Sequence, residues 1–149
     1  MFNWLRSIFG GGAVATAGGR GEQLVAAWLE RERGFAIVAR NWRSPRDRRD
    51  ELDLVGRDGD VLVFIEVKTR AAGALVPGYY AVGAHKKRVL RRAAGAYLAG
   101  LREKPRTVRF DVVEVALPPG GAKDQKVCEG GPVILHFENI PLFPKNFLP

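Results

Sequence analysis

The chain has 149 residues, of which 46% are hydrophobic, and its 24 Lys and Arg against 16 Asp and Glu give a net charge of +8. This length and composition suit one globular domain with a sizeable core, and they exclude a chain that is disordered throughout. The only cysteine, Cys128, excludes a disulfide framework and a cysteine-based zinc site, and we interpret it as a loop thiol without function.

The first residues are interpreted as a flexible extension, residues 1–18, in front of a single domain over residues 19–149. The apolar patch in residues 4–9 is interrupted by Arg6 and Ser7, so it lacks the uninterrupted apolar region of a signal peptide. No apolar run approaches the roughly 18 residues that a membrane span needs. We therefore expect a cytoplasmic protein with no stable membrane insertion.

The first half of the domain predicts one helix and three strands. Leu24 and Trp28 recur at i, i+4, as do Val25 and Leu29, which predicts a helix over residues 21–33 that ends at Gly34. Strands are predicted over residues 35–42, 52–55 and 61–68. The last two are joined by residues 57–60, whose central Asp-Gly is a strong hairpin signal.

The second half predicts a helix and two strands. After a glycine-containing connection, residues 85–101 form an amphipathic helix with an apolar stripe on one side and basic residues on the other. Strands follow over residues 108–115 and 133–137, separated by a polar loop. The proline-containing tail is expected to pack back on the core through Leu142, Phe143 and Phe147. The element order αβββαββ predicts an α/β fold with a mixed central sheet flanked by helices.

Acidic residues gather in the predicted hairpin. If the Asp58-Gly59 turn closes a two- or four-residue loop, paired residues place Asp53 opposite Phe64 and Glu51 opposite Glu66. One face then carries Glu51, Asp53, Glu66 and Lys68, and the other carries Leu52, Leu54, Val63, Ile65 and Val67. A three-residue loop would reverse the faces.

Two interpretations of this acidic cluster remain open. Carboxylates from adjacent strands make an oxygen-ligand site suited to Mg²⁺ or Mn²⁺, beside which Lys68 could orient a water molecule. Alternatively, the residues form a salt-bridge ladder in which Lys68 pairs with Glu66 and an arginine pairs with Asp53. Glu22 also has two interpretations, as an acid on the inner side of its helix or as a first-turn acid favoured by the helix dipole.

The positive charge is concentrated in one stretch. Residues 83–109 hold nine Lys and Arg and one acid, which accounts for the whole net charge. Such a localised positive face is typical of a protein that binds a polyanion. The candidate nucleic-acid-binding residues lie on the second helix: Lys86, Lys87, Arg88, Arg91 and Arg92.

Five segments together resemble a known family: GRGEQLVAAWLERERGFAIVARNWR, ELDLV, VFIEVKTR, HKKRVLRRAAGAYL and RFDVVEV, in this order from about residue 19 onwards. They are similar to the YraN-like family of small bacterial proteins. That family is related to the Holliday-junction resolvases and has the restriction-endonuclease-like fold with a PD-(D/E)xK site. The resemblance implies this fold here.

The resemblance also implies roles for individual residues. Asp53, Glu66 and Glu22 match metal-binding positions, and Lys68 matches the lysine of the E-V-K segment. Glu51 matches an acid that is expected to contact the metal ligands rather than the metal itself. The chain departs from the family at two places. Asp50, in an enlarged arginine-rich loop over residues 44–49, stands where the family has glycine, and Lys87 stands where glutamine is common.

These observations lead to two hypotheses. The first is a Mg²⁺- or Mn²⁺-dependent endonuclease that hydrolyses phosphodiester bonds in DNA, including branched structures; related resolvases imply a homodimer by analogy. The second is a non-catalytic module that binds nucleic acid or recruits a partner on a nuclease fold. Three further residues are weaker candidates: Asp111 as a sheet-edge acid, His85 as a phosphate contact and His136 as a structural residue.

Overall fold

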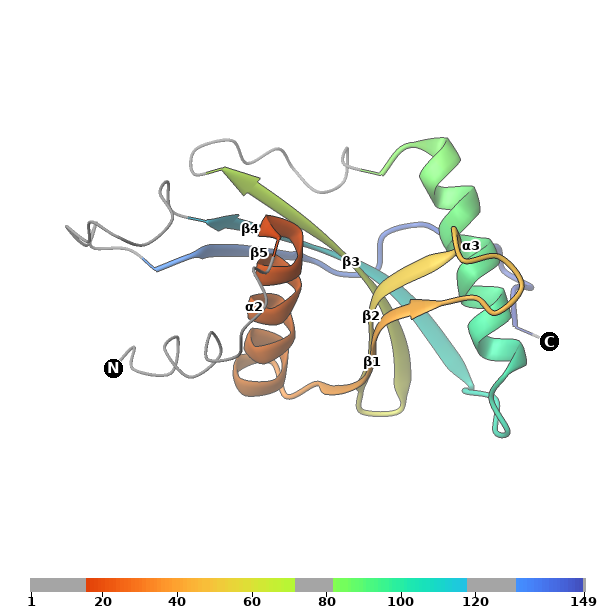
Figure 1. Cartoon of the computed structure of the whole chain (residues 1–149). Helices are drawn as coiled ribbons and strands as arrows, with labels where there is room; N and C mark the ends of the chain where they lie inside the picture. The colour runs from red at the N-terminus through yellow and green to blue at the C-terminus, as the bar shows by residue number, and fades with distance from the viewer. Residues whose placement is uncertain (1–15, 72–81, 118–130, 149) are drawn as a thin grey trace.

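The computed structural model describes residues 16–71, 82–117 and 131–148. These residues form α2 (Ala17–Glu32), β1 (Ala36–Arg43), β2 (Glu51–Asp58), β3 (Val61–Ala71), α3 (Ala84–Ala99), β4 (Thr107–Leu117) and β5 (Val133–Phe137) (Figure 1). The predicted order αβββαββ is confirmed. Cys128, the apolar patch in residues 4–9 and most of the two long connections lie outside the described residues. Within the described residues no helix has the length and apolar character needed to cross a membrane.

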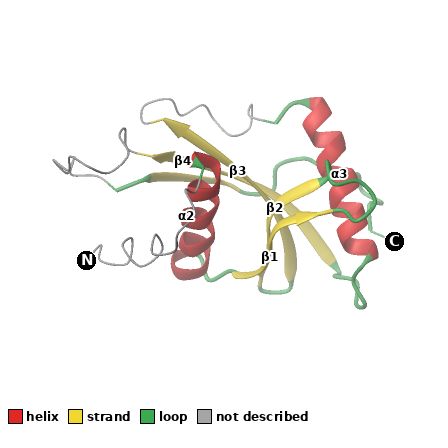
Figure 2. Ribbon diagram, viewed as in Figure 1, coloured by secondary structure: helices red, strands yellow, loops and turns green. Residues whose placement is uncertain are grey.

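The five strands form one mixed sheet whose spatial order, β1-β2-β3-β4-β5, follows the chain. Neighbouring strands are antiparallel except β3 and β4, which are parallel and are connected through α3. Figure 2 shows α2 and α3 on either side of β1 and β2. This mixed sheet with two helices is the α/β arrangement expected for a restriction-endonuclease-like fold.

The sheet is covered on both faces, which divides the apolar core in two. Phe64 of β3 and Phe110 of β4 pack with α3 residues such as Leu90, whereas Ile65 of β3 packs with α2 residues such as Leu29. Successive side chains of a strand point to opposite faces, so β3 and β4 are apolar almost continuously. The two helices therefore approach the same strands from opposite sides.

Helix α2 begins earlier than the sequence predicts. Its N-cap is Thr16, whose side chain accepts a hydrogen bond from the Gly19 N–H at 3.2 Å, and its first residue is Ala17 rather than residue 21. Hydrophobic periodicity does not detect this first turn because it consists mainly of small residues. The predicted end is confirmed, since Gly34 follows with the positive φ of 70° that favours glycine.

The hairpin turn lies one residue further along the chain than predicted. Asp58 pairs with Val61, so the two-residue loop is Gly59-Asp60 and not Asp58-Gly59. Gly59, with a φ of 57°, takes the first loop position, where a type II′ turn places glycine. Each paired residue of β2 therefore lies opposite a β3 residue two positions later than predicted. Because the shift is an even number, the paired residues keep their predicted faces. Continued along the strands, this register places Asp53 opposite Glu66.

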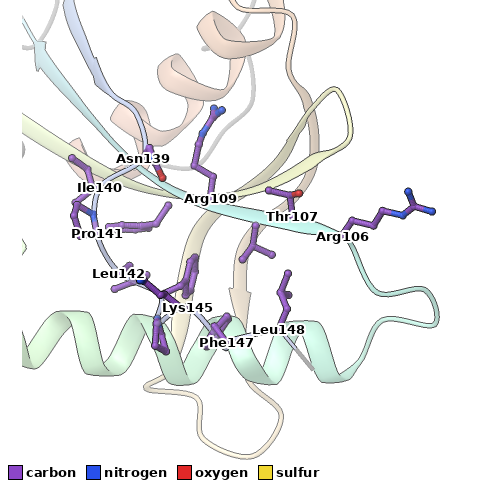
Figure 3. Close-up of a pocket in the computed structure, with 14 residues that line it drawn as sticks. Arg106, Thr107, Arg109, Asn139, Ile140, Pro141, Leu142, Lys145, Phe147 and Leu148 are labelled. Atoms are coloured by element: carbon purple, nitrogen blue, oxygen red, sulfur yellow. The ribbon is translucent and has the colours of Figure 1, made fainter.

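The tail packs against the core beneath α3. The Ile140 N–H donates to the Phe110 carbonyl at 2.8 Å, Leu142 is buried, and the Phe143 and Phe147 rings stack 4.4 Å apart. Figure 3 shows Leu142 and Phe147 between the start of β4 and α3, and both line a cavity of about 280 Å³. The tail thus covers the part of β4 that precedes its pairing with β5.

Candidate functional site

Glu66 lies on β3 with its side chain only 3% exposed, and its two carboxylate oxygens have different surroundings. Oε1 accepts from Lys68 Nζ at 2.8 Å and lies 3.3 Å from Lys86 Nζ at the start of α3. Oε2 is buried and has no hydrogen-bond partner among the described residues. A buried carboxylate oxygen left without a donor is costly, and a bound cation would relieve that cost.

Asp53 lies on β2 close to Glu66. Burial, followed by the charge of Glu66, raises the pKa of Asp53 to about 7, and the charge of Glu22 adds to this effect. The Val67 N–H opposes the shift by donating to Asp53 Oδ2 at 2.9 Å, and so does the charge of Lys86. These three carboxylates therefore repel one another across a shared site.

The side chain of Asp53 interrupts the pairing of β2 with β3. Within these two fully described strands, backbone pairing ends at Leu54 and Ile65, and the next available N–H, that of Val67, bonds to Asp53. The regular alternation of β2 also breaks here. Leu54 packs beneath α2, but Leu52 packs beneath α3, so the prediction that both share one face is wrong. The strands separate where the acids lie.

Glu22 reaches the site from α2. Because α2 begins at Ala17, Glu22 lies beyond the first turn, which contains no acid, and the helix-dipole interpretation is wrong. Burial raises the pKa of Glu22, a side-chain hydrogen bond with Asn41 lowers it, and the charges of Glu51 and Glu66 raise it further. Glu22 therefore faces the acidic residues of β2 and β3, as its position on the inner side of the helix predicts.

Close packing of α2 on the sheet brings Glu22 to this position. A Cβ atom at Gly21 would lie 1.9 Å from Thr69 Oγ1 on β3 and 3.2 Å from Val115 Cγ1 on β4, so only glycine fits. The neighbouring contact on β1, Asn41, has a φ of 49°, a conformation that asparagine adopts more readily than most residues. Sequence reasoning missed Asn41, for which the only signal is an asparagine within a strand pattern.

The salt-bridge ladder exists only in part. Lys68 pairs with Glu66 as that interpretation expects, but within the described residues no arginine pairs with Asp53. Glu51 lies at the outer edge of the site, where it is bound by Arg43 on β1 at 3.0 Å and its side chain remains 42% exposed. Its charge still acts on Glu22, so Glu51 borders the candidate ligands without joining them.

Glu22, Asp53 and Glu66 interact electrostatically, but their carboxylates do not surround a single point. Among the described residues no three His, Cys, Asp or Glu side chains converge closely enough to hold a metal ion. Their chemistry nevertheless fits a hard divalent cation. Glu66 Oε2 has no donor, and the carboxyl group of Asp53 carries a raised pKa because its ionised form lies among other negative charges.

The predicted nucleic-acid-binding residues divide into two groups. Two already contact acids: Lys86 is bound to Glu66, and Arg92 makes two hydrogen bonds to the buried Asp50, at 2.6 and 2.5 Å. The other three, Lys87, Arg88 and Arg91, lie on α3 without an ion-pair partner among the described residues and are at least partly exposed. Sequence reasoning missed both acid contacts because they join segments that are distant along the chain.

Asp111 belongs to a separate buried network on the α2 side of the sheet. It is completely buried on an inner strand, so its interpretation as a sheet-edge acid is wrong. It accepts from Arg109 at 2.9 and 3.0 Å and from the Asn139 N–H at 2.9 Å, and it lies 2.8 Å from His136 Nε2. Burial raises the pKa of Asp111, but these hydrogen bonds outweigh it and leave the pKa below its usual value. The network ties β4 to β5 and the tail.

A further buried acid, Glu114, was not singled out from the sequence. It lies beside Lys68 in the register of β3 and β4, and its nearest cation is Arg70, 3.8 Å away. Burial raises its pKa, while Arg70 and Lys68 lower it. The only sequence signal is a charged residue at a core-facing position of a strand.

Comparison with known proteins gives one consistent result. The model of the Uncharacterised protein family UPF0102 matches residues 21–115, which include the acidic site and α3. The chain is 47% identical to a UPF0102 protein of Beutenbergia cavernae, over 70% of this chain and 86% of the relative. It is 47% identical to one of Symbiobacterium thermophilum, over 70% and 85%, and 45% identical to one of Anaeromyxobacter dehalogenans, over 74% and 84%.

Proposed function

The chain belongs to the UPF0102 family, the YraN-like family that its motifs resemble, and we propose that it is a metal-dependent endonuclease that hydrolyses phosphodiester bonds in DNA. The observation that carries this proposal is the divided environment of Glu66, with two lysines on Oε1 and no donor for the buried Oε2. The large majority of buried side-chain oxygens in proteins have a hydrogen-bond partner, so an oxygen without one is consistent with a site for a ligand.

Glu22, Asp53 and Glu66 are the residues that would hold Mg²⁺ or Mn²⁺, with Glu66 contributing Oε2. Such an ion supplies a lowered pKa for a bound water molecule and neutralises charge that develops on the phosphoryl group. The Val67 N–H fixes one oxygen of Asp53 and leaves the other for a ligand.

The two lysines have separate roles in this proposal. Lys68, two residues after Glu66 on β3, would orient the attacking water and stabilise the negative phosphoryl oxygens; its bond to Glu66 supports this role. Lys86, from α3, balances the charge of the buried Glu66 and keeps the start of α3 beside the site. The remaining basic residues of α3 supply attraction for the phosphates of DNA.

The proposal is tested by incubating labelled duplex, single-stranded, flap, fork and four-way-junction DNA, and RNA, with Mg²⁺ or Mn²⁺. Wild type is compared with Glu66→Gln, Lys68→Ala and the control Glu30→Gln, which changes an exposed acid on the outer side of α2. We expect metal-dependent cleavage that falls by at least about 100-fold in the first two variants and is unchanged in the control.

Two results would contradict the nuclease. Cleavage that survives Glu66→Gln and Lys68→Ala would place the chemistry elsewhere. Absence of cleavage, together with salt-sensitive DNA binding that neither substitution alters, would favour the second hypothesis, a non-catalytic binding module.

A further inference from the structure

A second candidate site lies beside the acidic one, between the 44–50 segment and α3. It is a cavity of about 400 Å³ lined by Arg49, His85, Arg88, Val89 and Arg92. Three of the five lining residues are arginines, one is a histidine, and no acid is among them. We call this cavity the arginine pocket. Its lining suits an anion.

Two of the arginines are paired with acids that do not line the pocket. Asp50, 3% exposed, receives two hydrogen bonds from Arg92, and Asp47 receives hydrogen bonds from Arg49 at 3.0 and 2.9 Å. Each guanidinium has five N–H donors, so both retain donors for a ligand. The two bonds to the buried Asp50 orient Arg92 in advance, which reduces the entropy that a ligand would otherwise have to offset.

The segment that carries these acids is itself ordered by hydrogen bonds. The Ser44 N–H donates to the Asp50 carbonyl at 2.9 Å, and the Asp50 N–H donates to the Asp47 carbonyl at 3.0 Å. Ser44 is 2% exposed, and its Oγ accepts from the Arg46 N–H. The pocket is therefore a built feature of the fold, with one wall on α3 and the other on this segment.

The charge of the pocket is not fully neutralised. Arg88 has no acidic partner among the described residues, and neither does His85. Asp47 and Asp50 each balance one arginine, which leaves Arg88 as a cation in excess. A phosphate group presents several acceptor oxygens and a negative charge, which match the donors and the charge of this lining.

The pocket and the acidic site are joined by the first turn of α3. Lys86 contacts Glu66, whereas the adjacent His85 lines the pocket on another face of the helix. A strand whose scissile phosphate lies beside Glu66 would therefore pass over this turn. We propose that the arginine pocket binds a phosphate group of the nucleic acid, separate from the phosphate at the acidic site; the choice of nucleic acid as ligand rests on the proposed function.

The experiment measures binding of a fluorescent oligonucleotide in EDTA, so that neither metal nor cleavage contributes. Arg88→Ala removes the cation in excess, and the control Arg102→Ala removes an exposed arginine beyond the end of α3. We expect Arg88→Ala to weaken binding about tenfold more than the control does and to reduce the slope of log affinity against log salt by about one. Equal effects of the two substitutions would overturn the proposal.

A second variant separates a built pocket from general attraction. Asp50→Asn makes the protein more positive, so non-specific electrostatics predicts tighter binding. The same change loosens the hold on Arg92, so a built pocket predicts weaker binding, and tighter binding would overturn the proposal. Thermal melting establishes that each variant is folded, and Arg88→Ala, at an exposed position, supplies the result if Asp50→Asn unfolds.

The source of the phosphate is identified by comparing oligonucleotides with a 5′-hydroxyl and a 5′-phosphate. Loss of affinity for both in Arg88→Ala assigns the pocket to an internal phosphodiester, and loss for the 5′-phosphate strand alone assigns it to a strand end. If the protein binds DNA through Arg88 but does not cleave it, the proposal for the pocket stands and the proposal for nuclease activity fails. If the protein cleaves DNA but Arg88→Ala binds it as tightly as the control variant does, nuclease activity stands and the proposal for the pocket fails.

Discussion

Asp53 and Glu66 are neighbouring acids, the first partly buried and the second buried, but only Glu66 has lysines in direct contact. Asp53 has a backbone N–H and the more distant charge of Lys86, which leave its pKa raised to about 7 by burial and by Glu66. In the metal-free protein its ionised form is therefore destabilising. This is a typical consequence of a site formed for a ligand rather than for stability.

Asp53→Asn is expected to raise the free energy of unfolding of the metal-free protein by about 1–3 kcal/mol above pH 7. Above pH 7 wild-type Asp53 is ionised in both states, and ionisation costs free energy only in the folded state. As pH falls from 7 towards 4 the folded carboxyl group becomes protonated and the gain disappears. Urea unfolding at pH 8, 6 and 4 measures this.

In the same experiment at pH 8, added Mg²⁺ should stabilise wild type more than Asp53→Asn, because the variant lacks one proposed ligand. The difference in free energy of unfolding between the two should therefore become smaller. Glu103→Gln, at an exposed position, serves as the control and should change stability by less than about 0.5 kcal/mol. If Asp53→Asn raised the free energy of unfolding equally at pH 4, the gain would not come from removing the ionised carboxylate of Asp53.

Some of these residues were predictable and others were not. Asp53, Glu66 and Lys68 lie on one local hairpin, so alternation alone gathers them. Lys86 on Glu66 and Arg92 on Asp50 join segments 20 and 42 positions apart, and pairing over that distance depends on how α3 docks. Asn41 contributes through a left-handed backbone conformation that no periodicity reports.

At the scale of elements, the position of α2 depends on one close approach to the sheet. Gly21 contacts β3 and β4 where any side chain would collide with Thr69, and the next residue is Glu22. The same glycine therefore allows the helix to pack and sets the distance of a candidate ligand from the site.

Gly21→Ala is expected to destabilise the protein by about 2–3 kcal/mol, because the added methyl group would lie 1.9 Å from Thr69 Oγ1 and the helix must shift. Gly95→Ala in α3 is the matched control. No atom lies within 4 Å of its added Cβ, so it should stabilise by about 0.5–1 kcal/mol. Thermal melting of both variants is the measurement, and equal shifts of the same sign would contradict this account.

The predicted elements were most accurate where the hydrophobic pattern is strong, as in β3 and α3. The turn between β2 and β3 was misplaced because Asp58-Gly59 and Gly59-Asp60 are both acceptable hairpin centres, and backbone conformation decides between them. Leu52 was assigned to the wrong core because strict alternation assumes an unbroken ladder. Asp53 breaks the ladder with its side chain, so the misassignment lies at the candidate site itself.

At the scale of the whole molecule, the tail completes one of the two cores. It lies beyond the residues that the family model matches, yet Leu142 is 6% exposed and packs with the α3 cluster. The tail also fills the space beside β4 before β5 begins to pair with it.

Leu142→Ala is therefore expected to lower the free energy of unfolding by about 2–3 kcal/mol through lost burial and the cavity that remains. Lys145→Ala, an exposed change in the same tail, should stay within about 0.5 kcal/mol of wild type. Urea unfolding compares the two. If Leu142→Ala lowered the free energy of unfolding no more than Lys145→Ala does, the tail would not contribute to the stability of the core.

The position of β4 has a consequence for how the molecule is assembled. Phe110 and Val112 of β4 belong to the core beneath α3, and Val113 and Val115 belong to the core beneath α2. A chain emerging from the ribosome can pair β1, β2 and β3 as successive hairpins, but both cores remain incomplete until β4 has been synthesised and has crossed over through α3. Because α3 precedes β4 in the chain, both cores reach their full burial only after the basic helix that contacts Glu66 through Lys86 has been synthesised.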